Sequence, residues 1–161
     1  MGKLKIFHIN LRNARIAMDK LTKNLEDYKD AIVSTNEITR KANFIPNLNT
    51  LSKALAVKTK TDRTRAAIYI KGDEFKRILI IQLSTPDIAM AEITGDNECF
   101  ILISAYLPPD GNYKMTLSSL ANAINKIEPD KKIIICSDTN SKKGTKITVS
   151  PSYYTSPQGN L

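Results

Sequence analysis

Apolar residues recur along this chain with a period of two in some stretches and of three to four in others. The first stretch, residues 4–11, alternates and predicts a β-strand. In residues 15–28 the apolar positions fall at three- and four-residue steps, which predicts a helix with one apolar face. A short apolar run at 31–35 predicts a second strand. Residues 43–55 contain Pro46 and several Asn residues, which is typical of a loop.

The centre of the chain predicts a run of strands separated by turn-forming residues. It begins after a polar loop at 58–62, and each gap between strands contains Gly, Asp, Asn or Pro. The expected strands are 65–71, 77–83, 88–94 and 99–106. After a break at 108–112, helical spacing predicts a second helix over 114–127. An Ile-rich run then predicts a last strand over 132–136.

This order of elements is typical of a layered α/β fold with a mainly antiparallel sheet. A chain of 161 residues is long enough for one domain with a real core and short for two, so we expect a single domain over residues 1–161. The tail at 141–161 is polar and has the character of a loop that stops before a further element.

Lys and Arg outnumber Asp and Glu by 24 to 16, which gives a net charge of +8 and a pI near 9.5. Such a charge favours a polyanionic partner, nucleic acid first and an acidic membrane surface second. The basic residues are scattered along the sequence, which is equally the pattern of a solvated surface. No stretch approaches the roughly 20 apolar residues that cross a bilayer, and no secretory signal is visible. We therefore expect an intracellular protein without a membrane role.

Polar residues follow several predicted strands at the point where each strand ends. They are Asn10, Asn36 with Glu37, Tyr106, and Asp138 with Asn140. Strand ends are where α/β folds bring side chains together, and carboxylate and amide oxygens suit a hard ion such as Mg²⁺. Any one of these residues alone is more often a turn former. Their recurrence points to a site, but it does not name a reaction.

Five segments, in order, resemble the endonuclease/exonuclease/phosphatase superfamily, and within it the endonuclease domains of non-long-terminal-repeat retrotransposons. The segments are 4–12 (LKIFHINLR), 31–39 (AIVSTNEIT), 65–70 (RAAIYI), 103–110 (ISAYLPPD) and 134–141 (IICSDTNS). The resemblance implies a layered α/β sandwich of that type. It also implies that the C-terminal half is absent, and we expect the second sheet of the sandwich to lie in that half.

The resemblance also implies roles for the strand-end residues. Glu37 binds Mg²⁺ or Mn²⁺, and Asn10 orients the ligand or phosphate beside it. Asp138 orients and helps to deprotonate the attacking water, while Asn140 and Tyr106 contact the scissile phosphate. The implied partner is DNA, nicked to leave a 3′-hydroxyl that primes reverse transcription. A nuclear location is compatible with that target, and no obligate protein partner is implied.

The chain also departs from the family pattern. Ser137 replaces the usual Gly and Thr139 the usual Phe, and Asn36 stands where Gln is usual. The family's further Asp and its Ser-Asp-His segment do not occur, and His8 is the only His. We therefore expect an incomplete copy of the enzyme. Two alternatives stay open: a non-catalytic nucleic-acid-binding remnant of the same fold, and a lipid- or nucleotide-phosphatase relative.

Overall fold

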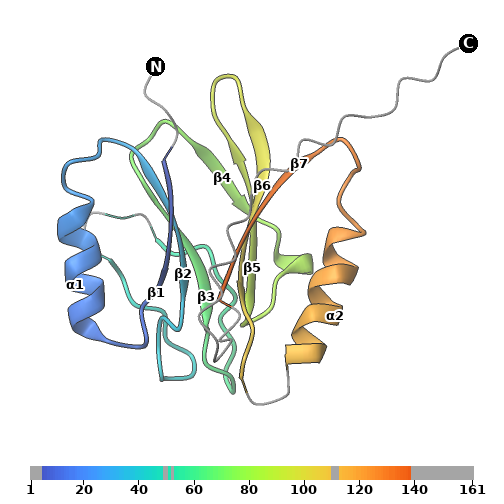
Figure 1. The fold of residues 1–161 in the computed structure, drawn as a ribbon, viewed down its shortest axis with the longest axis horizontal. Coiled ribbons are helices and arrows are strands. Elements are labelled where there is room, and N and C mark those ends of the chain that lie inside the picture. The colour runs from blue at the N-terminus through green and yellow to red at the C-terminus, as the bar shows by residue number, and fades with distance from the viewer. Residues whose placement is uncertain (1–4, 49–50, 52, 110–112, 139–161) are drawn as a thin grey trace, which may run out of the picture.

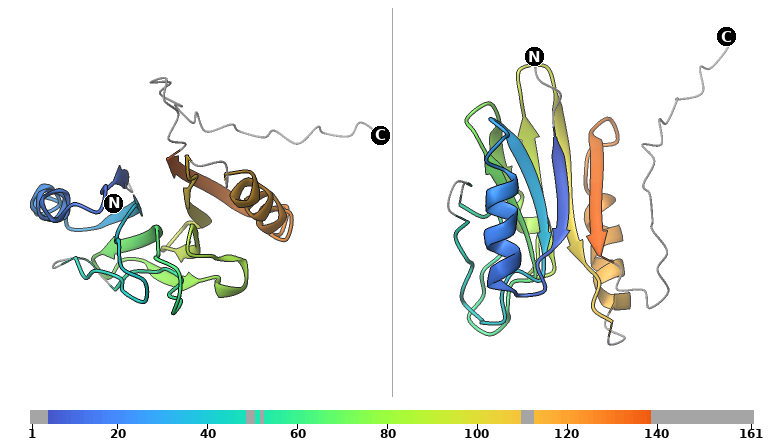
Figure 2. Two further views of the ribbon diagram at one scale, coloured as in Figure 1. Left: turned by 90° about the horizontal axis from the view of Figure 1, so that it is seen from below. Right: turned by 60° about the vertical axis from the view of Figure 1, so that its left-hand side comes forward.

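Two β-sheets lie face to face between two helices in the computed structural model of the chain (Figure 1). The structure describes residues 5–48, 51, 53–109 and 113–138. One sheet has three strands in the order β1-β2-β3, and the other has four in the order β4-β5-β6-β7. Figure 2 shows α1 on the outer face of the first sheet and α2 on the outer face of the second. The described chain is therefore a helix–sheet–sheet–helix sandwich.

The elements follow the predicted order. The strands are β1 (Ile6–Asn10), β2 (Ala31–Asn36), β3 (Ala66–Lys71), β4 (Lys76–Leu79), β5 (Ile88–Thr94), β6 (Cys99–Tyr106) and β7 (Lys132–Asp138). The helices are α1 (Arg15–Asn24), the 3-10 turn η1 (Ile81–Leu83) and α2 (Tyr113–Ile124). Strands β5 and β6 have the predicted bounds. Strand β7 continues two residues past the predicted end, so that Asp138 is its last residue.

Helix α2 ends three residues before its predicted end, at Ile124, and two other predicted elements end four residues early. Helix α1 ends at Asn24, although Leu25 and Tyr28 still pack against the core, which is why the apolar spacing continues past its end. The strand expected over 77–83 ends at Leu79. After Leu79 the chain turns away as η1, and Ser84 donates a hydrogen bond to the Ile80 carbonyl at 2.8 Å. An apolar run alone does not distinguish a strand from such a turn.

The expectation that the second sheet lies in an absent half is wrong. Inner-face side chains of both sheets form one buried cluster within the described residues. Its members are Ile32, Ala66, Ile68, Ile70, Ala89, Ala91, Ile93, Phe100 and Leu102. Side chains of the opposite parity pack outward against α1 and α2 in two further clusters. This alternation follows from the two-residue period of a strand, and it explains why β2, β3, β5 and β6 are buried on both faces.

Strand pairing brings the predicted functional residues to one end of the sandwich. Strands β1 and β2 are parallel, with Asn10 opposite Asn36, and β6 and β7 are parallel, with Tyr106 opposite Asp138. The three remaining strand pairs are antiparallel, in agreement with a mainly antiparallel arrangement. The carboxyl ends of β1, β2, β6 and β7 all lie at the lower end of the sandwich in Figure 1.

Candidate active site

At this end of the sandwich the space between the sheets is polar. On β1, β2 and β6 the last two inward-facing side chains are polar or carry a hydroxyl group, in place of the apolar side chains nearer the start of each strand. These pairs are His8 and Asn10, Ser34 and Asn36, and Ser104 and Tyr106; on β7 the polar Asp138 follows Cys136, which still packs against the apolar cluster. Each pair is spaced i and i+2, so both members face the same side. The core between the sheets thus changes from apolar to polar along its length.

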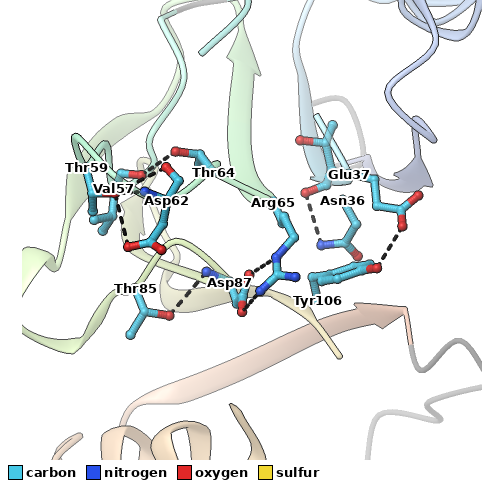
Figure 3. Close-up of polar contacts among 11 residues, drawn as sticks. Asn36, Glu37, Val57, Thr59, Asp62, Thr64, Arg65, Thr85, Asp87 and Tyr106 are labelled. Carbon is cyan, nitrogen blue, oxygen red and sulfur yellow. Dashed lines mark hydrogen bonds and ion pairs between the residues drawn. The ribbon is translucent and has the colours of Figure 1, made fainter. Parts of the chain in front are cut away.

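Hydrogen bonds between the sheets join these side chains. The Asn10 side-chain amide donates to the Asp138 carboxylate. The Tyr106 hydroxyl donates to Oε1 of Glu37 at 2.7 Å (Figure 3). Deeper in, Asn36 Nδ2 donates to Ser104 Oγ at 3.3 Å. Four residues predicted from the sequence therefore form two hydrogen-bonded pairs, Asn10 with Asp138 and Glu37 with Tyr106, and each pair joins the two sheets.

The backbone of Glu37 has the left-handed conformation, with φ of 50°. Strand alternation alone would point the residue after Asn36 to the outer face, toward α1. Instead the carboxylate reaches Tyr106 on the opposite sheet. The conformation is fixed on both sides, because the Glu37 N–H donates to the Arg65 carbonyl at 2.7 Å and its carbonyl accepts from the Asn13 N–H at 2.7 Å. A non-glycine residue held in this region is uncommon and is found preferentially at functional sites.

Tyr106 is almost fully buried, with 3% of its surface exposed. Burial, followed by the hydrogen bond to Glu37 and the charge of that carboxylate, raises the pKa of Tyr106 to about 12. The Arg65 guanidinium lies over the Tyr106 ring, 5.1 Å from its centroid, and is held there by two hydrogen bonds to the Asp87 carboxylate (Figure 3). The phenol therefore keeps its proton at neutral pH and acts as a fixed hydrogen-bond donor.

Asn10 is oriented by its own turn. Its carboxamide oxygen accepts a hydrogen bond from the Arg12 N–H at 2.8 Å, which leaves the amide nitrogen to donate to Asp138. His8 is the inward-facing residue before Asn10 on β1, and its Nδ1 is 3.0 Å from Ser34 Oγ. Partial burial lowers the pKa of His8, while the Asp138 carboxylate and hydrogen bonds to Ser34 and Ser137 oppose that shift.

Comparison with solved structures gives a match to the endonuclease domain of TRAS1, a telomere-specific non-LTR retrotransposon. The TM-score is 0.71 and the sequence identity is 22%, over 86% of this chain and 60% of that domain. The chain has the fold of this endonuclease domain. No protein-family model and no curated protein matches the sequence. The resemblance read from the sequence segments is therefore confirmed at the level of the fold.

On this endonuclease fold the donor atoms suit a hard divalent cation. Glu37 and Asp138 supply carboxylate oxygens and Asn10 an amide oxygen, the ligand types that Mg²⁺ prefers. The buried carboxamide oxygen of Asn36 has no hydrogen-bond partner among the described residues, and a cation or its bound water would satisfy it. The described ranges contain no group of three or more His, Cys, Asp or Glu side chains that lie close enough together to hold a metal ion. Mg²⁺ commonly uses one or two carboxylates, with water and phosphate completing its shell.

Several contacts at the site were not predicted from the sequence. Ser104 stands two positions before Tyr106 in an apolar strand, and that spacing could have signalled it. The Arg65–Asp87 pair gives no such signal, because the two residues meet only through the fold. Asn140, predicted to contact the phosphate, lies outside the described residues. No described helix is long and apolar enough to span a membrane.

Proposed function

We propose that this chain carries the catalytic centre of a divalent-metal-dependent DNA endonuclease of the retroelement type. The observation that carries the proposal is the convergence of Glu37, Tyr106, Asn10 and Asp138 from two facing sheets, through the hydrogen bonds Tyr106–Glu37 and Asn10–Asp138. The endonuclease fold supports the reaction class, and the net charge of +8 supports a polyanionic substrate.

The residues of the site would have the following roles in the reaction. Glu37 would hold Mg²⁺ or Mn²⁺, which when bound supplies positive charge to the phosphate oxygens and acidifies water. Tyr106 keeps its proton, and when DNA is bound its single O–H would turn from Glu37 to donate a hydrogen bond to a phosphate oxygen. Asp138 would accept a proton from the attacking water, with Asn10 holding the carboxylate in place. Asn140 is proposed to contact the same phosphate.

The product of this reaction would be a nick with a free 3′-hydroxyl. The chain spans 60% of the TRAS1 endonuclease domain. We further propose that it corresponds to the N-terminal part of such a domain, because its five resembling segments start from the family's opening strand. The family's second Asp and its His would then act in the remaining part. One proton-transfer group contributes about 10²- to 10⁴-fold to a rate, so the chain alone is expected to nick slowly.

A plasmid assay tests this function. Micromolar protein is incubated for hours with supercoiled plasmid and Mn²⁺ or Mg²⁺, and the nicked circles are then offered to a DNA polymerase with labelled nucleotide. We expect slow nicking that EDTA abolishes and ends that the polymerase extends without prior treatment. DNA binding without nicking at every metal concentration would instead support the non-catalytic nucleic-acid-binding alternative.

A further inference from the structure

The basic charge of the molecule is concentrated in the long connection between β2 and β3. Residues 37–65 contain seven Lys and Arg against two acidic residues, which is a net +5 out of the +8 of the whole chain. Six of these basic side chains are exposed, and five of the six flank the Ala42–Arg63 β-bridge: Arg40, Lys41, Lys58, Lys60 and Arg63. We call these five residues the basic ridge. They lie in two stretches of this one connection, 40–41 and 58–63.

Backbone contacts bring the two halves of the ridge together. Ala42 forms a β-bridge with Arg63, which places Arg40 and Lys41 beside Arg63. Lys58 and Lys60 lie in the turn that leads to Arg63. That turn is held by a hydrogen bond from the Asp62 N–H to Thr59 Oγ1 at 2.9 Å (Figure 3). The charges are therefore carried by a loop whose backbone is held by a β-bridge and by a hydrogen bond within its turn.

The ridge adjoins the candidate active site. The Glu37 N–H is bonded to the Arg65 carbonyl, so the connection starts and ends at the site. The charge of Arg63 also acts to lower the pKa of Tyr106, against the larger effect of burial. Neither ion pair within the described part of the chain involves a ridge residue. The Asp62 carboxylate accepts a hydrogen bond from Thr61 at 3.1 Å within the turn.

An exposed aromatic ring stands next to these charges. Phe44 keeps 47% of its surface exposed and lies two residues beyond the Ala42–Arg63 bridge. The intervening Asn43 has the left-handed backbone conformation, with φ of 54°. Basic side chains beside an exposed ring are the combination that binds unpaired nucleic acid, through phosphates and through base stacking.

We propose that the basic ridge holds the phosphate backbone of the DNA strand that enters the active site, and that Phe44 stacks on an unpaired base of that strand. The inference rests on the proposed function in one respect: the strand on the ridge is taken to be the one whose phosphate reaches Glu37 and Tyr106. Binding itself needs neither metal nor catalysis, so the two proposals can fail separately.

The test is a fluorescence-anisotropy titration of a fluorescein-labelled 24-nucleotide single strand and its duplex, in EDTA, across a range of NaCl concentrations. The ridge variant carries Arg40→Gln, Lys41→Gln and Arg63→Gln. The control variant carries Lys76→Gln, Lys126→Gln and Lys132→Gln, which remove the same charge from exposed positions at the opposite end of the sandwich. We expect the ridge variant to lower the slope of log affinity against log salt by about 2 to 3. The control variant should leave it nearly unchanged.

Phe44→Leu is expected to weaken single-strand binding about tenfold, without changing the salt slope. Tyr113→Leu removes another exposed ring, on α2, and should have little effect. Equal losses of slope in the ridge and control variants would overturn the ridge proposal. Equal effects of Phe44→Leu and Tyr113→Leu would overturn the stacking. If the ridge variant alone loses binding while the chain never nicks DNA, the ridge stands and the proposed catalysis fails.

Discussion

Glu37→Gln is expected to lower the rate of metal-dependent plasmid nicking by about 10²- to 10³-fold, to the background of the assay. The substitution keeps the size of the side chain and an oxygen that can accept from Tyr106, but it removes the negative charge that would hold the cation. The measurement is the first-order conversion of supercoiled to nicked plasmid with protein in excess. Thermal unfolding of the variant should stay close to that of the native chain.

The matched control is Glu98→Gln, which removes the same charge from an exposed turn between β5 and β6, at the opposite end of the sandwich. This variant should nick at the native rate. Nicking that survives Glu37→Gln, or that falls equally in the two variants, would show that the carboxylate of Glu37 does not take part in the reaction.

Leu102→Ala is expected to destabilise the chain by about 2–5 kcal/mol, because it leaves a cavity in a packed core. Leu102 is fully buried on the inner face of β6, in the cluster that joins the two sheets. For a chain of this size the loss corresponds to a fall in Tm of about 2–4 °C per kcal/mol. Differential scanning calorimetry measures it directly.

Leu117→Ala on α2 is the control, because the same atoms are removed from a side chain that is 43% exposed. Its Tm should change by no more than a degree or two for a surface substitution within about 0.5 kcal/mol. If both variants melt at the native temperature, the two sheets do not pack against each other as the structure has them, and the inner face of β6 is in water.

The elements that the sequence predicted well are those whose apolar pattern is long and bounded by turn residues. Strand β6 is such a case, with turn residues before Cys99 and two Pro residues soon after Tyr106. The pattern fails where apolar residues continue past the end of an element, as at η1 and after α1. Tertiary packing, rather than periodicity, fixes those ends.

The candidate site was predictable only in part, for a similar reason. Strand-end positions placed Asn10, Tyr106 and Asp138 at one edge, since side chains at the carboxyl ends of parallel neighbours meet. The direction of the Glu37 side chain depends on a positive φ that no spacing reveals. The link between Arg65 and Asp87 depends on how β3 and β5 are stacked, and that is set by packing between the sheets.

A manganese titration followed by NMR would locate the bound cation in the chain without requiring activity. Mn²⁺ is added to the ¹⁵N-labelled chain, and the loss of each amide signal is followed. We expect the signals of Asn10, Glu37 and Asp138 to broaden first, and Glu37→Gln to raise the Mn²⁺ concentration required. Signals around Glu98 should be unaffected. Broadening that begins elsewhere, or that Glu37→Gln leaves unchanged, would contradict the assignment of this end of the sandwich as a metal-dependent active site.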